Sequence, residues 1–178
     1  AELHAASAPH REDGQVVYPG TCRGLTAEQA AERARRTGRA PALRLWAPEE
    51  EINFNDGHMG EYREWLPADC GDFLLRRSDG IFAYQLAVVV DDAEMGVTQV
   101  VRGSDLLSST PRQRYLLELL GCPAPEYGHV PLLLAPDGRR LAKRDRDQEL
   151  GALQSCYSAQ ELVGQLALLA GLITEYAP

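Results

Sequence analysis

The sequence lacks the features that mark membrane-spanning, secreted and broadly basic proteins. Its 178 residues contain no apolar run near the roughly 18 residues of a membrane span, and the first residues have neither the basic flank nor the apolar stretch of a signal peptide. The four cysteines form no CxxC pair, which favours reduced thiols in a cytoplasmic protein over a disulfide framework. Lys and Arg number 18 against 26 Asp and Glu, and the net charge of −8 excludes nucleic-acid binding through bulk charge alone.

The pattern of apolar residues and turn signals predicts strands alternating with helices. Three capping boxes predict helix starts, at Thr26, Thr110 and Ser158, and Gly38 predicts the end of the first of these helices. The segment 47–70 is polar and is expected to be irregular. Strands are expected at 42–46, 72–77, 81–90, 97–101 and 129–134.

This order predicts the second half of a doubly wound α/β sheet. Residues 1–70 are expected to be inserted before it. Residues 71–138 would form the sheet and its helices, and residues 139–178 a basic loop and C-terminal helices.

Ligands bind beyond the carboxyl ends of the strands in such sheets, and Arg102 is expected at one of these ends. Its guanidinium could hold a carboxylate through two parallel hydrogen bonds, with Gly103 allowing close approach of the backbone. The alternative is a salt bridge to Asp91, Asp92 or Asp105.

Three other groups could carry chemistry. Tyr84, expected inside the strand 81–90, either packs in the core or lines a pocket. The basic loop around Arg140 and Lys143 either holds phosphates or is a solvated charged loop. Tyr18 and Cys22 could supply two zinc ligands, which by themselves do not make a site.

Several segments together resemble the catalytic core of class I glutamyl-tRNA synthetases. They are the hairpin GDFLLRRSDG (71–80), the runs YQLAVVVDD (84–92) and VRGSDLLSSTPRQ (101–113), and HVPLL (129–133) followed by the basic loop, which resembles the KLSKR form of the class I signature loop. Within this family the run RGSDLL, the segment YPGTCR (18–23) and the 34 residues after Arg144 are most similar to the short glutamyl-queuosine tRNA(Asp) synthetases. The implied fold is the C-terminal part of a Rossmann-like catalytic core with an inserted α+β, zinc-type segment.

The resemblance implies a role for each matching residue. Tyr84 and Arg102 would hold the substrate glutamate, with Arg102 on its carboxylate. Tyr18 and Cys22 would be zinc ligands. Backbone groups of Leu132 and Leu133 would contact adenine, and the cationic side chains of Arg140 and Lys143 would bind the ATP phosphates.

The implied reaction is activation of glutamate by ATP with Mg²⁺, then transfer of the glutamyl group to queuosine in the anticodon loop of tRNA(Asp). It needs no protein nucleophile. A cytoplasmic monomer is expected. Arg140 and Ala142 depart from the Lys and Ser of the signature loop, and no segment resembles the HIGH motif, so the chain is expected to hold part of the core. Two alternatives stay open: a fragment of an ordinary glutamyl-tRNA synthetase, and a degenerate core that binds tRNA or a partner without catalysis.

Overall fold

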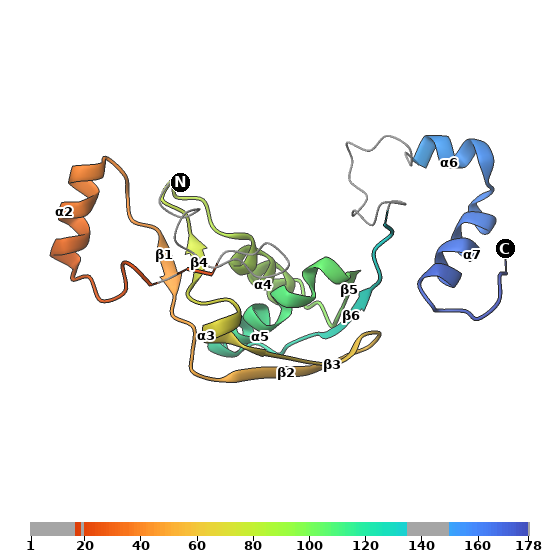
Figure 1. Cartoon of the computed structure of the whole chain (residues 1–178), viewed down its shortest axis with the longest axis horizontal. Helices are drawn as coiled ribbons and strands as arrows, with labels where there is room; N and C mark the ends of the chain where they lie inside the picture. Colours follow the sequence, from red (N-terminus) through yellow and green to blue (C-terminus); the bar gives the residue numbers. More distant parts are fainter. Residues whose placement is uncertain (1–16, 19, 135–149, 178) are drawn as a thin grey trace.

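The computed structural model describes residues 17–18, 20–134 and 150–177, apart from the side chains of residues 150 and 152. Its strands lie in the first three-quarters of the chain, and two helices follow (Figure 1). The elements in chain order are α2 (Ala27–Thr37), β1 (Leu43–Leu45), β2 (Glu51–Asp56), β3 (Gly60–Trp65), α3 (Leu66–Asp69), β4 (Phe73–Arg76), α4 (Tyr84–Glu94), β5 (Gln99–Gly103), the 3-10 helix η1 (Ser104–Ser109), α5 (Thr110–Leu119), β6 (Glu126–Val130), α6 (Leu150–Cys156) and α7 (Ala159–Leu169).

The described strands pair in twos. β1 with β4 and β2 with β3 are antiparallel, whereas β5 and β6 are parallel, with Arg102 opposite His129 and Gly103 opposite Val130. α5 lies between β5 and β6 in the chain and forms their crossover, as expected for an α/β unit. The α/β class is therefore confirmed for this part of the chain.

Local signals predicted two helices correctly. Thr26 and Gln29 form the reciprocal hydrogen bonds of a capping box at α2, and Gly38 ends this helix with a left-handed φ of 65°. Ser158 and Glu161 do the same at α7. Each device depends on residues three or four positions apart, so the surrounding fold does not alter it.

The expected strand 81–90 is wrong, because the structure places helix α4 there. Its β-branched run favours a strand by propensity, but Leu86, Val89 and Ala93 recur at helical spacing and pack on the core with α5. Burial on one helical face overrides the weak strand preference of the Val residues.

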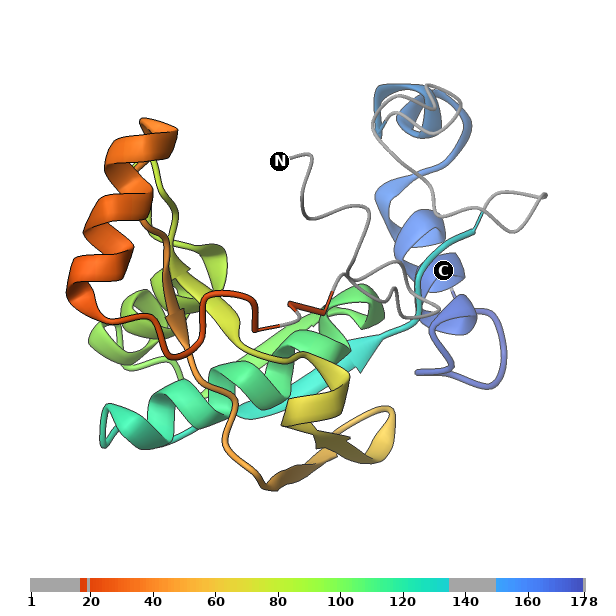
Figure 2. The same ribbon diagram turned by 60° about the vertical axis from the view of Figure 1, so that its left-hand side comes forward.

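The segment 47–70 is also ordered, contrary to expectation. It contains the hairpin β2–β3, in which the rings of Phe54 and Tyr62 pack in a tilted arrangement with their centroids 5.6 Å apart. The hairpin turn contacts β6, because the amide of Gly57 donates a 2.8 Å hydrogen bond to the carbonyl of Tyr127. Figure 2 shows this hairpin below α5, in gold.

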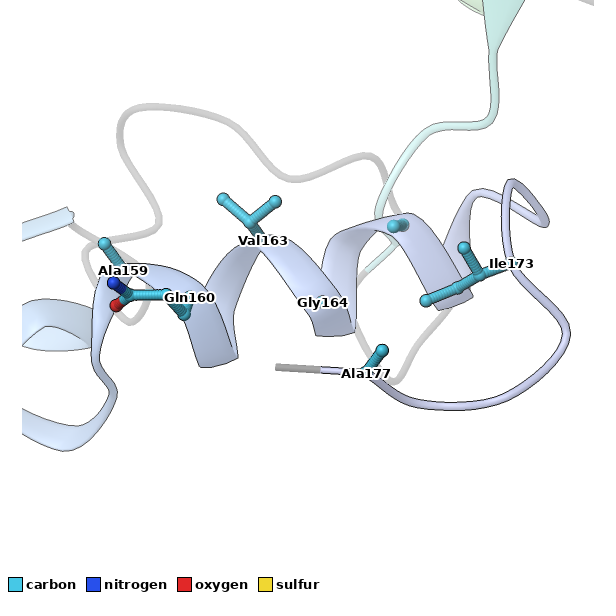
Figure 3. Close-up of a pocket in the computed structure, with 7 residues that line it drawn as sticks. Ala159, Gln160, Val163, Gly164, Ile173 and Ala177 are labelled. Atoms are coloured by element: carbon cyan, nitrogen blue, oxygen red, sulfur yellow. The ribbon is translucent and has the colours of Figure 1, made fainter.

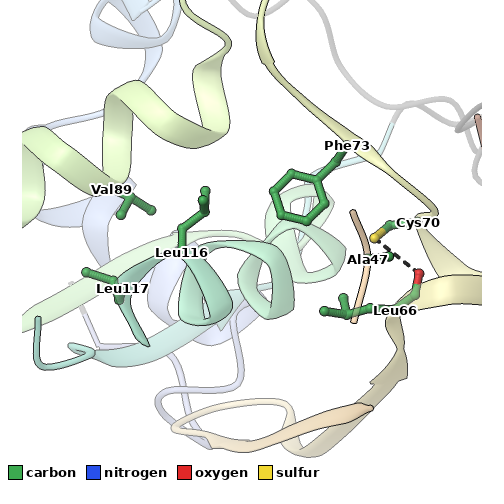
Figure 4. Close-up of a cluster of buried hydrophobic side chains, with 7 residues drawn as sticks. All are labelled: Ala47, Leu66, Cys70, Phe73, Val89, Leu116 and Leu117. Atoms are coloured by element: carbon green, nitrogen blue, oxygen red, sulfur yellow. Dashed lines mark hydrogen bonds between the residues drawn. The ribbon is translucent and has the colours of Figure 1, made fainter. Parts of the chain in front are cut away.

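The main apolar cluster lies between α4, α5, α3 and β4 (Figure 4). Leu66 is fully buried there, and Cys70, expected to be a small packing residue, donates from Sγ to the carbonyl of Leu66. None of the four cysteines forms a disulfide. The seven buried members of the cluster are Ala47, Leu66, Cys70, Phe73, Val89, Leu116 and Leu117.

Within the described residues, no helix has the length and apolar character needed to cross a membrane.

Candidate functional site at the carboxyl edge of the parallel strands

The carboxyl ends of β5 and β6 bring several predicted site residues together. Arg102 and Gly103 end β5, and Leu132 and Leu133 follow the end of β6. A Cβ atom on Gly103 would lie 2.9 Å from Cδ2 of Leu132 and 2.6 Å from Oδ1 of Asp105. Both side chains therefore lie against this glycine, and the structure places Leu132 beside the strand position next to Arg102.

Arg102 is held by three side chains. Its Nη2 donates to Thr110 Oγ1 and to Gln113 Oε1, each at 2.8 Å, and its Nε donates to Nε2 of His129 at 3.0 Å. The guanidinium carbon also lies 5.3 Å from the ring centroid of Tyr127. Nη1 makes no hydrogen bond within the described residues and is not a buried atom. This nitrogen is therefore available to a ligand.

The expected alternative, a salt bridge from Arg102 to Asp91, Asp92 or Asp105, is wrong for the described part of the chain. The ion pairs there involve other basic residues. The hydrogen-bond partners of Arg102 are a hydroxyl, a side-chain amide, an imidazole and the backbone carbonyl of Leu106, none of which carries a negative charge.

The partners of Arg102 also explain a wrong prediction about helix α5. Thr110 was expected to cap this helix with Gln113 closing the box, but Ser109 is the N-cap residue and forms no side-chain capping bond. The Thr110 hydroxyl and the Gln113 carbonyl accept from Arg102 instead. A sequence that resembles a helix cap therefore serves the site.

Behind His129 lies a buried carboxylate, Asp56, at the end of β2. Its Oδ2 is 2.6 Å from Nδ1 of His129, and its Oδ1 accepts from three backbone amides, those of His58, Met59 and His129, at 2.9–3.0 Å. Asp56 is 2% exposed and His129 is fully buried. These hydrogen bonds occupy both carboxylate oxygens.

Burial alone would raise the pKa of Asp56, because it disfavours the charged form. The hydrogen bonds from the Met59 amide, from the side chain and amide of His129 and from the His58 amide outweigh this effect and lower the pKa from 3.8 to about 2. Asp56 is therefore ionised at neutral pH. It is a buried negative charge that is connected to Arg102 by hydrogen bonds through the His129 ring.

Tyr84 is not buried in a strand, as was expected, but begins helix α4 with 53% of its surface exposed. The next residue, Gln85, connects this helix to the Arg102 site. The side-chain oxygen of Gln85, Oε1, accepts a hydrogen bond from Nε2 of Gln113 at 2.8 Å, and the side-chain nitrogen Nε2 of Gln85 donates to the Ser109 hydroxyl at 3.0 Å. The structure thus links the helix start that carries Tyr84 to Arg102 through two glutamine amides.

The predicted zinc ligands Tyr18 and Cys22 lie close together, since the backbone amide of Cys22 donates a 2.8 Å hydrogen bond to the Tyr18 hydroxyl. Among the residues that the structure describes, no group of three His, Cys, Asp or Glu side chains could hold a metal. Two candidate ligands fall short of the four that a structural zinc takes. The described residues therefore do not supply a complete set of zinc ligands.

Arg140 and Lys143 lie outside the described residues, so their convergence with Arg102 stays a prediction. Two pockets lie elsewhere. One, of about 440 Å³, is lined by α7 residues such as Val163 and Gly164 together with Ile173 (Figure 3). The other, of about 490 Å³, lies beside Arg39, Arg44 and Arg77. Neither pocket is lined by a predicted glutamate or ATP residue.

Asp56, His129 and Gln113 were not identified as site residues from the sequence. His129 was assigned only to a buried strand, and Asp56 to an irregular polar segment. The signal available for His129 was a polar side chain within an apolar strand, a position that needs a buried partner. Nothing local indicates that this partner is 73 positions away.

The sequence is similar to that of a family of known proteins. Residues 4–172 match the family described as tRNA synthetases class I (E and Q), catalytic domain. The chain is 53% identical to a glutamyl-Q tRNA(Asp) synthetase of Nitratidesulfovibrio vulgaris over 97% of its own length and 53% of that protein. It is 51% identical to one of Symbiobacterium thermophilum over its whole length and 55% of that protein. The chain therefore spans about half the length of these relatives.

The fold is also similar to solved structures. The chain superposes on a glutamate tRNA ligase from Elizabethkingia meningosepticum, crystallised in complex with its amino acid, with a TM-score of 0.60 and 32% identity. The match covers 74% of this chain and 27% of that one. A glutamate-tRNA synthetase from Elizabethkingia anophelis gives a TM-score of 0.59.

Proposed function

The chain belongs to the family of class I tRNA synthetase catalytic domains for glutamate and glutamine, and from this premise we propose that the protein activates glutamate with ATP and transfers it to queuosine in tRNA(Asp). The observation that carries the proposal is Arg102, a guanidinium with no carboxylate partner among the described residues and one outward nitrogen at the carboxyl edge of two parallel strands. The names of the relatives at about 50% identity support the choice of queuosine and tRNA(Asp).

In the first step a glutamate carboxylate oxygen attacks the α-phosphate of ATP, and pyrophosphate leaves. Arg102 would bind a glutamate carboxylate through Nη1, and Tyr84 would contact the same substrate from the start of α4. Backbone groups of Leu132 and Leu133, beyond the end of β6, would contact adenine, and Lys143 and Arg140 would neutralise phosphate charge. Mg²⁺ is expected to accompany the ATP phosphates.

In the second step the adenylate carbonyl is attacked by a hydroxyl of the queuosine base, and AMP leaves. The protein contributes by positioning and by charge stabilisation, and no side chain becomes covalently modified. Because glutamate, ATP and tRNA meet in the cytoplasm, the proposal places the protein there. No step is assigned to zinc.

The test is ATP–pyrophosphate exchange by the intact protein with glutamate, with and without tRNA. Exchange that depends on glutamate but not on tRNA supports the proposal. A strict tRNA requirement would assign the protein to the ordinary glutamyl-tRNA synthetases, and no exchange under either condition would favour a non-catalytic core.

The second half of the reaction is tested with two tRNA(Asp) preparations, one containing queuosine and one lacking it. Labelled glutamate should be transferred only to the modified tRNA. Equal transfer to both preparations would contradict queuosine as the acceptor.

A further inference from the structure

Asp56 reaches Arg102 through the two ring nitrogens of His129. Arg102 Nε donates to His129 Nε2 at 3.0 Å, so Nε2 must carry a lone pair. The proton of the imidazole must then be on Nδ1, from which it is donated to Asp56 Oδ2 at 2.6 Å. The carboxylate therefore fixes the tautomer of His129, and this tautomer fixes the acceptor that Arg102 needs.

Burial makes this chain of hydrogen bonds rigid. His129 and Thr110 are fully buried, and Asp56 and Gln113 are each 2% exposed. The His129 ring is stacked on Tyr127 with an interplanar angle of 13°. Because the side chains of His129, Thr110 and Gln113 that accept from the guanidinium are buried, they fix the direction in which its unbonded nitrogen, Nη1, points.

The same arrangement leaves the charge of Arg102 available. A carboxylate bonded directly to the guanidinium would have to be displaced by the carboxylate of a substrate. Here the imidazole separates the two charges, so Asp56 compensates the partly buried positive charge of Arg102 without occupying the face that a ligand would use.

We propose that Asp56 and His129 are positioning residues for substrate carboxylate binding: they orient Arg102 through a fixed His129 tautomer and balance its charge. This inference rests on the proposed function for the identity of the substrate, glutamate, but its tautomer component is independent of that function.

The discriminating variant is Asp56→Asn in the intact protein. Three backbone amides donate to the position of Oδ1, so the asparagine must place its oxygen there and its NH₂ group at the position of Oδ2. This NH₂ group donates to His129 Nδ1 and forces the ring proton onto Nε2. The Nε2 proton then opposes the N–H of Arg102, which loses its acceptor and must move, while the ring can donate instead to Thr110 Oγ1, 3.3 Å away.

The expected result in ATP–pyrophosphate exchange is a KM for glutamate raised about 10- to 100-fold, with the KM for ATP within twofold of the wild type, because a displacement of about 1 Å at a binding group has effects of this size. The matched control is Glu64→Gln, which removes a buried carboxylate from the same hairpin, one bonded to the hydroxyl of Tyr62. Its KM for glutamate should stay within twofold of the wild type.

A second variant guards against failure of Asp56→Asn to fold. Thr110→Val keeps the side-chain shape but removes the hydroxyl that accepts from Arg102 Nη2, and it should raise the KM for glutamate selectively by a smaller factor. Equal increases for glutamate and ATP, an equal effect of Glu64→Gln, or unchanged glutamate KM values in both site variants would overturn the proposal.

Imidazole ¹⁵N spectra separate this inference from the proposed function. The wild-type protein should carry the His129 proton on Nδ1, and Asp56→Asn should carry it on Nε2. If the wild type shows no glutamate-dependent exchange, the proposed function fails, and these spectra still decide the positioning arrangement. A proton that stays on Nδ1 in the variant would refute it.

Discussion

Acid should destabilise the protein through one buried group, Asp56. Its pKa falls from 3.8 to about 2 on folding, because the hydrogen bonds to its two oxygens outweigh the cost of burying its charge. A carboxyl with a lowered folded-state pKa contributes stability above its unfolded-state pKa and loses it as the pH falls through the folded-state value. This contribution is therefore complete above about pH 5 and is lost between about pH 4 and pH 2.

The size of the effect follows from the two pKa values. Each pKa unit corresponds to about 1.4 kcal/mol, so Asp56 contributes roughly 2 kcal/mol to the free energy of unfolding at neutral pH. Asp56→Asn cannot ionise and lacks this pH-dependent part. The wild type should be more stable than the variant at pH 7, and this gap, the difference between their free energies of unfolding, should narrow by about 2 kcal/mol as the pH falls to 2.

Urea unfolding at pH 7, 5, 3 and 2 measures this gap, and the Asp56 carboxyl ¹³C shift followed by NMR measures the pKa directly. Glu51→Gln is the matched control, since it removes an exposed charge from the first position of the same strand. The free energy of unfolding of this control should change with pH in the same way as that of the wild type. A gap between wild type and Asp56→Asn that is constant from pH 5 to pH 2 would refute the reasoning.

Two further predictions concern packing and helix ends. Leu66→Ala should lower the free energy of unfolding by about 2–5 kcal/mol in urea titrations, because Leu66 is fully buried in the main cluster. The control Leu43→Ala, at a position that is 58% exposed, should lower it far less. Equal losses in the two variants would contradict this assignment of the core. Thr26→Ala should remove the capping box of α2 and destabilise that helix by about 1 kcal/mol, which would be measured as faster amide hydrogen exchange within Ala27–Thr37. The global free energy of unfolding should be nearly unchanged, because α2 buries no residue. Slower or unaltered exchange within the helix would contradict the prediction.

The sequence was sufficient where structure depends on near neighbours. The capping boxes at Thr26 and Ser158 and the strands β1 and β4 were predicted because caps and turns are set within a few residues. Helix α4 was missed because its Val-rich run has strand propensity, and only its packing against α5 decides the matter. The β2–β3 hairpin was missed because two of its buried positions carry carboxylates, Asp56 and Glu64, which makes the segment look uniformly polar.

The candidate site was also predicted only in part. The position of Arg102 at a strand end follows from the sequence, because the carboxyl edge of an α/β sheet is where ligands bind. The groups that hold Arg102 could not be found in this way. Thr110 and Gln113 resembled a helix cap, and Asp56 meets His129 across 73 positions.

The hairpin β2–β3 therefore has a role that its composition does not suggest. Its contacts with β6 include the hydrogen bond from the Gly57 amide to the Tyr127 carbonyl and the two hydrogen bonds between Asp56 and His129, and the Asp56–His129 contact continues to Arg102. A hairpin bound in this way cannot shift without moving the imidazole, and the imidazole cannot shift without removing an acceptor from the guanidinium. Gly57→Pro, which removes the amide that donates to the Tyr127 carbonyl, should therefore raise the KM for glutamate in ATP–pyrophosphate exchange, although the turn does not touch Arg102. Gly57→Ala, whose Cβ would lie 3.5 Å from that carbonyl oxygen, should leave this KM unchanged.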